Sequence, residues 1–118
     1  MYKRQVLEFI EFPAFTKRLM ALAKEHADDV LLGMQSDLLA NPERGRVVEG
    51  TAGVRKARAA DPARGKGKRG GFRYLYYYIE QGGQIYLLMI FNKDEQDDLT
   101  KDQKKTLAKL IQELRETK

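Results

Sequence analysis

The 118-residue sequence contains no cysteine, no tryptophan and a single histidine, His26. Without cysteine the chain can form neither disulfide bonds nor thiolate metal sites, and this composition fits a reducing cytoplasm, the location we expect. Nucleophilic catalysis of the Ser-His-Asp or Cys-His type needs an imidazole base. His26 lies between two expected helices, far in sequence from the basic region described below, so we interpret it as a helix-end residue.

Long apolar runs are also absent. No stretch approaches the ~20 apolar residues that span a bilayer, and the N-terminus lacks the apolar core of a signal peptide, so we expect no membrane partner. The acidic group at residues 94–98 lacks the glycine and the final glutamate of a calcium loop. We therefore expect no metal and no cofactor, and one domain over residues 1–118.

Positive charge is present and unevenly distributed. The net charge is +5, but residues 44–73 hold ten Lys and Arg against two acids, whereas the rest of the chain is slightly acidic. The segment RGKGKRGGFR, residues 64–73, contains five cations, four glycines and no acid. This concentration indicates a polyanionic partner. The alternative is a solvated surface that only aids solubility.

Hydrophobic periodicity predicts the elements. An alternating strand is expected at residues 5–12 and helices at about 13–22 and 28–40, with Asp28 as a candidate cap for the second helix. Residues 47–53 are expected to form a turn-rich connection. Strands follow at 54–59, 72–80 and 85–91, and a helix at 99–118 begins with the capping-box pattern of Thr100 and Gln103. The order β-α-α-β-β-β-α predicts an α+β fold with an antiparallel meander that the first strand joins.

Strand alternation suggests where the cations lie. Arg73 shares a face with Leu75 and Tyr77, and at the start of such a run its guanidinium is expected to emerge into a cleft. Regular alternation places Phe91 and Lys93 on the face of Ile85. Antiparallel pairing through the turn at 81–84 brings the start of one strand to the end of the next. The residues expected to converge there are Lys66, Lys68, Arg73 and Lys93, with Phe91 as an aromatic surface beside them.

This combination suits RNA. Lysine and arginine neutralise phosphates, and an aromatic face can stack an unpaired base. RNA also supplies a nucleophile, because its 2′-hydroxyl can attack the adjacent phosphorus once a base removes the proton and cations stabilise the added negative charge. A lysine whose pKa is lowered by neighbouring cations can be that base, so the chemistry requires neither histidine nor metal.

The basic and aromatic segments together resemble the RelE/HigB group of bacterial type II toxins. The segments that carry the resemblance are GTAGVRK (50–56), KGKRGGFR (66–73) with YYY (76–78), YLLMIFNKDE (86–95) and DLT (98–100). The resemblance covers about residues 41–112. It implies a RelE/ParE-type α+β fold and a metal-independent endoribonuclease that cuts mRNA on the ribosome and so inhibits translation. It also implies a cognate antitoxin as partner, besides mRNA and ribosomal RNA.

The resemblance also implies roles for individual residues. Lys66 or Lys68 would act as base or phosphate ligand, Arg73 would stabilise the phosphorane-like state, and Lys93 would do so or help protonate the leaving 5′-oxygen. The residues that would hold the RNA backbone are Arg55, Lys56, Arg58 and Arg69. Some relatives have tyrosine where this chain has Phe91, which can stack but cannot transfer a proton, so acid and base stay unassigned among the cations.

Two other functions remain open on the same fold. One is a non-enzymatic inhibitor of DNA gyrase, as in ParE-type relatives, and the other is a ribosome- or RNA-binding module without catalysis. The dense cluster of cations at 66–73 together with Lys93 favours the nuclease, because a protein–protein inhibitor has less need of converging positive charge. The C-terminal helix is interpreted as core packing, with antitoxin binding as the alternative.

Overall fold

A computed structural model describes residues 6–64, 71–95 and 98–117. Five strands form one sheet in the order β1-β5-β4-β3-β2. The strands are β1 (Glu8–Glu11), β2 (Arg46–Val47), β3 (Arg55–Ala59), β4 (Phe72–Ile79) and β5 (Gln84–Asn92). β1 runs parallel to β5, and all other neighbours are antiparallel. The predicted α+β class, the meander and the addition of the first strand to its sheet are confirmed.

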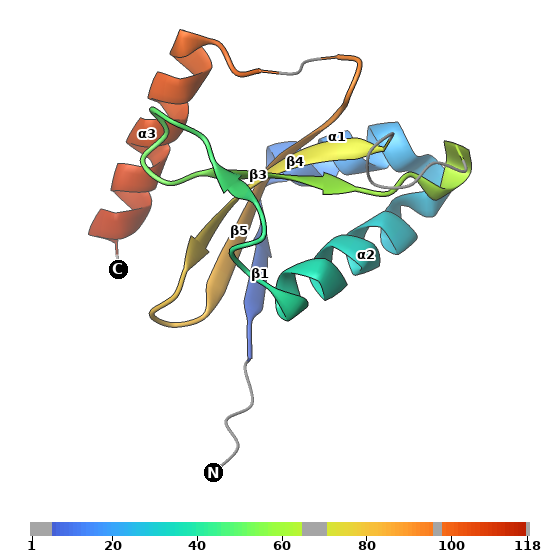
Figure 1. Ribbon diagram of the computed structural model, residues 1–118, viewed down its shortest axis with the longest axis horizontal. Coiled ribbons are helices and arrows are strands. Elements are labelled where there is room, and N and C mark those ends of the chain that lie inside the picture. Colours follow the sequence, from blue (N-terminus) through green and yellow to red (C-terminus); the bar gives the residue numbers. More distant parts are fainter. Residues whose placement is uncertain (1–5, 65–70, 96–97, 118) are drawn as a thin grey trace.

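Three helices cover the sheet: α1 (Pro13–Ala23), α2 (Ala27–Ala40) and α3 (Lys101–Glu116). Figure 1 shows the α1–α2 pair and α3 on different sides of the strands. Pro13 occupies the first turn of α1, where its missing N–H costs nothing. α3 begins with the predicted capping box of Thr100 and Gln103, in which both reciprocal hydrogen bonds form.

The predicted cap of α2 is wrong. A short 3₁₀ turn, Lys24–His26, joins α1 to α2, so His26 takes the cap position and Asp28 lies inside the first turn of the helix. No side chain caps α2. Because the chain passes directly from one helical turn into the next, there is no extended residue at which an aspartate could cap. Asp28 still places negative charge near the positive end of the helix dipole.

Two apolar clusters lie on opposite faces of the sheet. Phe15, Met34 and Tyr74 belong to the cluster beneath α1 and α2. Leu75, Tyr77 and Ile111 belong to the cluster beneath α3. Strand β5 contributes to both clusters, as expected for a nearly continuous apolar strand with neighbours on each side.

A β-bulge overturns one prediction about β5. Leu75 pairs with Met89, but the next residue, Tyr76, pairs with Leu87, so Leu88 is an extra residue in β5. The alternation shifts by one at this point. Phe91 therefore lies with Leu88 in the cluster beneath α3, and not on the face of Ile85 as regular alternation predicts. The bulge is what places Phe91 on the face of Arg73.

Candidate nucleic-acid interface

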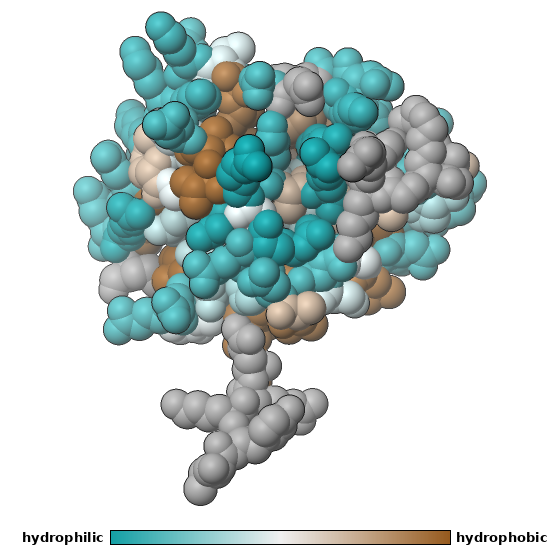
Figure 2. Space-filling model, in the orientation of Figure 1, coloured by the Kyte–Doolittle hydropathy of each residue, from teal (hydrophilic) through white to brown (hydrophobic). Residues whose placement is uncertain are grey.

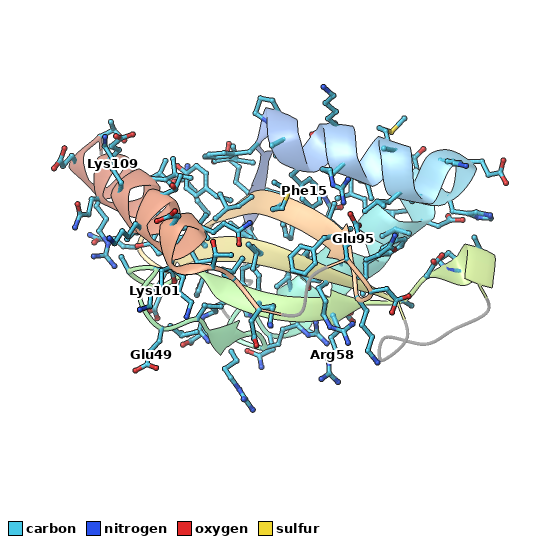
Figure 3. The ribbon with its side chains drawn as sticks, turned by 90° about the horizontal axis from the view of Figure 1, so that it is seen from above. Phe15, Glu49, Arg58, Glu95, Lys101 and Lys109 are labelled. Atoms are coloured by element: carbon cyan, nitrogen blue, oxygen red, sulfur yellow. The ribbon has the colours of Figure 1, made fainter. Side chains whose placement is uncertain are left out.

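Three side chains, one from each of β3, β4 and β5, form a row across one end of the sheet. Arg73 in β4 pairs with Arg58 in β3 and with Phe91 in β5. Directly paired residues of antiparallel strands point to the same face, so the side chains of the three residues are neighbours. The structure thus brings together an exposed cation, a second cation and an aromatic ring from three strands. In Figure 3 the side chain of Arg58 projects outward from the sheet.

The burial of Arg73 differs from the prediction. Only 5% of Arg73 is exposed, and its Nη1 donates a hydrogen bond to the carbonyl oxygen of Phe72 at 3.4 Å. The sequence predicts a guanidinium that emerges into a cleft. β4 is the central strand of the sheet, so Arg58 and Phe91 of the adjacent strands flank Arg73 on both sides. Arginine is seldom buried this deeply in proteins unless its charge is paired.

Phe91 is also less open than predicted. It is 7% exposed and belongs to the cluster beneath α3, so its ring is not an open platform for base stacking. It lines a pocket of about 670 Å³ between the sheet, α1 and α3, together with Leu75, Met89 and Leu107. Figure 2 shows apolar surface beside α3. The sequence places α3 on the sheet but does not reveal that this helix shields the ring.

The connection between β3 and β4 contains the glycine-rich segment, and we call it the glycine-rich loop. Its base lies next to this row, because Ala59 at the end of β3 pairs with Phe72 at the start of β4. A Cβ at Gly71 would lie 2.1 Å from the carbonyl oxygen of Ala59, so only glycine fits this backbone approach. The predicted site residues Lys66, Lys68 and Arg69 lie outside the described residues.

Lys93 lies at the same end of the sheet. It follows Asn92, which pairs with Phe72, the neighbour of Arg73. Lys93 is exposed and belongs to a turn that leaves β5. The predicted convergence of the start of β4 with the end of β5 therefore holds for the backbone. Arg58 and Lys93 are exposed cations beside the enclosed Arg73.

The remaining predicted RNA contacts divide between the two faces. Lys56 lies on the face of Arg58, and its Nζ is 3.9 Å from a carboxylate oxygen of Asp98. Arg55 points to the opposite face, where its Nη1 donates to the carbonyl oxygens of Glu43 and Gly45 at 3.0 and 2.7 Å. Arg55 thus holds the segment before β2 and is not brought together with the row.

Arg46 is a cation that the sequence analysis missed. It is exposed in β2 and pairs with Lys56, so it shares the face of Lys56 and Arg58. β2 has only two residues, and the turn-rich composition after Val47 concealed it. A strand of two residues is too short to show a period-two pattern, so no local signal in the sequence revealed it.

Other features limit the chemistry of the described residues. His26 lies at the junction of α1 and α2, outside the row, and its Nε2 is 3.7 Å from Glu25. Within residues 6–64, 71–95 and 98–117, no group of three His, Cys, Asp or Glu is placed to hold a metal ion. No helix in that part of the chain has the length and apolar character to cross a membrane.

The comparisons with known proteins identify the fold as that of RelE toxins. No protein-family model matches the sequence. A mutant of the E. coli toxin RelE in the free state matches with a TM-score of 0.55 and 14% identity, over 79% of this chain and 90% of that chain. At 14% identity the likeness shows a shared RelE-type fold.

Two toxin–antitoxin complexes show the same fold. A chain of the intact E. coli RelBE complex matches with a TM-score of 0.54 and 12% identity, over 74% of this chain and 96% of its own length. A chain of the archaeal RelE–RelB complex from Pyrococcus horikoshii matches with a TM-score of 0.51 and 20% identity, over 76% of this chain and 98% of its own length. The predicted RelE-type fold is therefore confirmed.

Proposed function

We propose that this chain is the toxin of a type II toxin–antitoxin pair and that it cleaves mRNA on the ribosome. The observation that carries the proposal is the meeting of Arg58, Arg73 and Lys93 with the base of the glycine-rich loop at one end of a RelE-type sheet. Residues 1–118 would act as one domain in the cytoplasm. The similarity to chains from RelE–RelB complexes supports a cognate antitoxin as the second partner.

The cleavage would use the 2′-hydroxyl of the RNA itself. Lys66 or Lys68 removes the hydroxyl proton, the oxygen attacks the adjacent phosphorus, and the bond to the 5′-oxygen breaks. Arg73 and Arg58 supply positive charge against the pentacoordinate phosphate, and Lys93 stabilises the same charge or protonates the leaving 5′-oxygen. The products are a 2′,3′-cyclic phosphate and a 5′-hydroxyl. None of these steps uses a metal or a cofactor.

The burial of Arg73 and Phe91 modifies this assignment. Arg58 and Lys93 offer exposed cations to a phosphate, whereas Arg73 supplies charge from beneath. Phe91 packs against the helix side of the site and is not assigned a stacking role. Arg46 and Lys56 extend the cationic surface along β2 and β3 and would hold the RNA backbone.

Transcript cleavage tests the proposal. Purified protein is added to ribosomes translating a defined mRNA, in buffer containing enough magnesium for the ribosome, and 5′ ends are mapped. Lys68→Ala and Lys93→Ala should each lower the cleavage rate about 100-fold or more, the usual cost of removing a base or a charge-stabilising group. Lys109→Ala removes an exposed charge from α3, away from the row, and should cleave at the wild-type rate.

Growth arrest gives a second measurement. Expression of wild type should stop growth, and Arg73→Ala or Lys68→Ala should abolish the arrest while circular dichroism shows a retained fold. Toxicity that is unchanged in both variants contradicts the proposed site. Arrest without new transcript ends would instead identify a non-enzymatic inhibitor, acting either on gyrase or on the ribosome. Arrest that survives Lys66→Arg together with Lys68→Arg would exclude a lysine base, and an RNA-binding module is expected to tolerate these charge-preserving changes.

A further inference from the structure

An ion pair joins α1 to the turn that carries Lys93. Nη2 of Arg18 lies 2.6 Å from each carboxylate oxygen of Glu95, across 77 positions of sequence. The Nε of the same guanidinium donates to the carbonyl oxygen of Ile90 in β5 at 3.5 Å. Glu95 lies between the end of β5 and α1 in Figure 3. One arginine therefore contacts both the last part of β5 and the turn after it.

Glu95 also closes that turn. Its Oε1 accepts a hydrogen bond from the backbone N–H of Asn92 at 2.9 Å, and its own N–H donates to the carbonyl oxygen of Asn92 at 3.1 Å. These bonds enclose Lys93 and Asp94 in a turn held at both ends. The N–H of Asn92, and then the guanidinium of Arg18, lower the pKa of the Glu95 carboxyl, so the carboxylate stays ionised at neutral pH.

The helix end of the pair is fixed by the core. Phe15 and Leu19 of α1 are 0% and 3% exposed, so the helix cannot rotate about its axis without exposing them. The charged side chains are themselves 36% and 41% exposed. Pairs this open to water contribute little to overall stability. Arg18 nevertheless contacts both carboxylate oxygens of Glu95 and the carbonyl oxygen of Ile90. The pair is therefore better suited to fixing the position of the turn than to stabilising the fold.

We propose that Arg18 and Glu95 are positioning residues that hold the Lys93 turn at the Arg73 end of the sheet. The inference rests on the proposed function, because Lys93 is the group whose placement matters for cleavage. Asn92 pairs with the neighbour of Arg73, so a turn that begins at Asn92 and is tied to α1 keeps Lys93 at a constant distance from the row. Without the pair, the turn can leave the end of β5, and the ammonium group spends less time near the phosphate.

The test measures cleavage constants on ribosome-bound mRNA. Arg18→Ala and Glu95→Gln should each lower kcat about tenfold and leave KM within twofold, because the pair acts on placement of Lys93 and not on RNA affinity. The double variant should be no slower than the slower single variant, as expected for two residues that act as one unit. Arg18→Lys, which keeps one charge, should recover part of kcat. Lys17→Ala removes an exposed cation from the same helix and should match wild type.

Amide hydrogen exchange supplies a readout that does not depend on RNA. The Asn92 amide, protected by Glu95, should exchange at least fivefold faster in Arg18→Ala, while amides of β4 keep their wild-type rates. Glu95→Gln tests the same pair if Arg18→Ala does not fold, because it changes an exposed side chain without changing its size. Wild-type kcat in both variants, or unchanged exchange at Asn92, overturns the positioning role alone. A wild-type protein that cuts no RNA overturns the proposed function, and the role in catalysis with it.

Discussion

Gly71 occupies the tightest backbone position at the site. A Cβ there would lie 2.1 Å from the carbonyl oxygen of Ala59 and 2.8 Å from the backbone nitrogen of Asp61. These atoms are main chain and cannot rotate away. Gly33, in contrast, lies on the exposed face of α2, where a Cβ would meet no described atom within 4 Å beyond its own helical turns. A side chain is therefore excluded at Gly71, whereas Gly33 has room for one.

We predict opposite effects of the same substitution at the two positions. Gly71→Ala should lower the free energy of unfolding by about 1–3 kcal/mol, because the methyl group forces the base of the loop apart. Gly33→Ala should raise it by about 0.5–1 kcal/mol, because alanine is the better helix former. Urea titrations followed by circular dichroism measure both. A Gly71→Ala variant as stable as wild type would contradict the close approach of the loop ends.

At the scale of the element, α3 is held by hydrogen bonds at its two ends and by an apolar stripe that faces the sheet. Thr100 and Gln103 exchange hydrogen bonds at its start, at 3.2 and 2.9 Å. Near its end, Arg115 donates to the hydroxyl of Tyr77 and to the carbonyl oxygen of Ala52, both at 3.0 Å. Ile111 is buried, and Leu107, Leu110 and Leu114 pack half-buried against the same cluster. The cap adds to this packing by satisfying backbone N–H groups of the first turn.

Thr100→Ala should lower the free energy of unfolding by about 1 kcal/mol, because the N–H of Gln103 loses its acceptor. The loss should be visible as a lower thermal midpoint by circular dichroism. Lys105→Ala, on the exposed surface of the same helix, should leave the midpoint almost unchanged. Equal midpoints for Thr100→Ala and wild type would show that α3 does not depend on the capping box.

For the whole molecule, one buried hydroxyl links stability to alkaline pH. Tyr74 is fully buried between the sheet and the helical pair, where Nη1 of Arg44 donates to its hydroxyl at 3.3 Å. Burial raises the pKa of Tyr74 to about 12. The unfolded chain releases this proton near pH 10, earlier than the folded chain. The stabilisation is thus complete below pH 10 and is lost as the pH rises toward 12.

We predict that wild type loses on the order of 2–3 kcal/mol more stability between pH 10 and 12 than Tyr74→Phe does, since each pH unit is worth about 1.4 kcal/mol. Urea midpoints measured at half-unit intervals from pH 9 to 12 give the comparison. The variant corrects for the titration of lysines, which both proteins share. Parallel curves for the two proteins would contradict a raised pKa at Tyr74.

Local patterns predicted most of the secondary structure and one essential feature of the site. Alternating and helical spacing, the turn at 81–84 and the Thr100 capping box depend on residues close in sequence, which is why they could be read directly. Antiparallel pairing through a short turn then placed Arg73 and Lys93 at the same end of the sheet. The roles of Lys66, Lys68 and Arg69 stay predictions, because these residues lie outside the described part of the chain.

The sequence by itself thus determined the order of the elements and the end of the sheet where the positive charge gathers, because both follow from interactions between near neighbours. Only the tertiary structure decided the face of Phe91, the enclosure of Arg73 and the partnership of Arg18 with Glu95. The extra residue in β5 is defined only against its partner strand. The burial of a side chain and the meeting of charges 77 positions apart depend on how whole layers pack, and no local pattern records that packing.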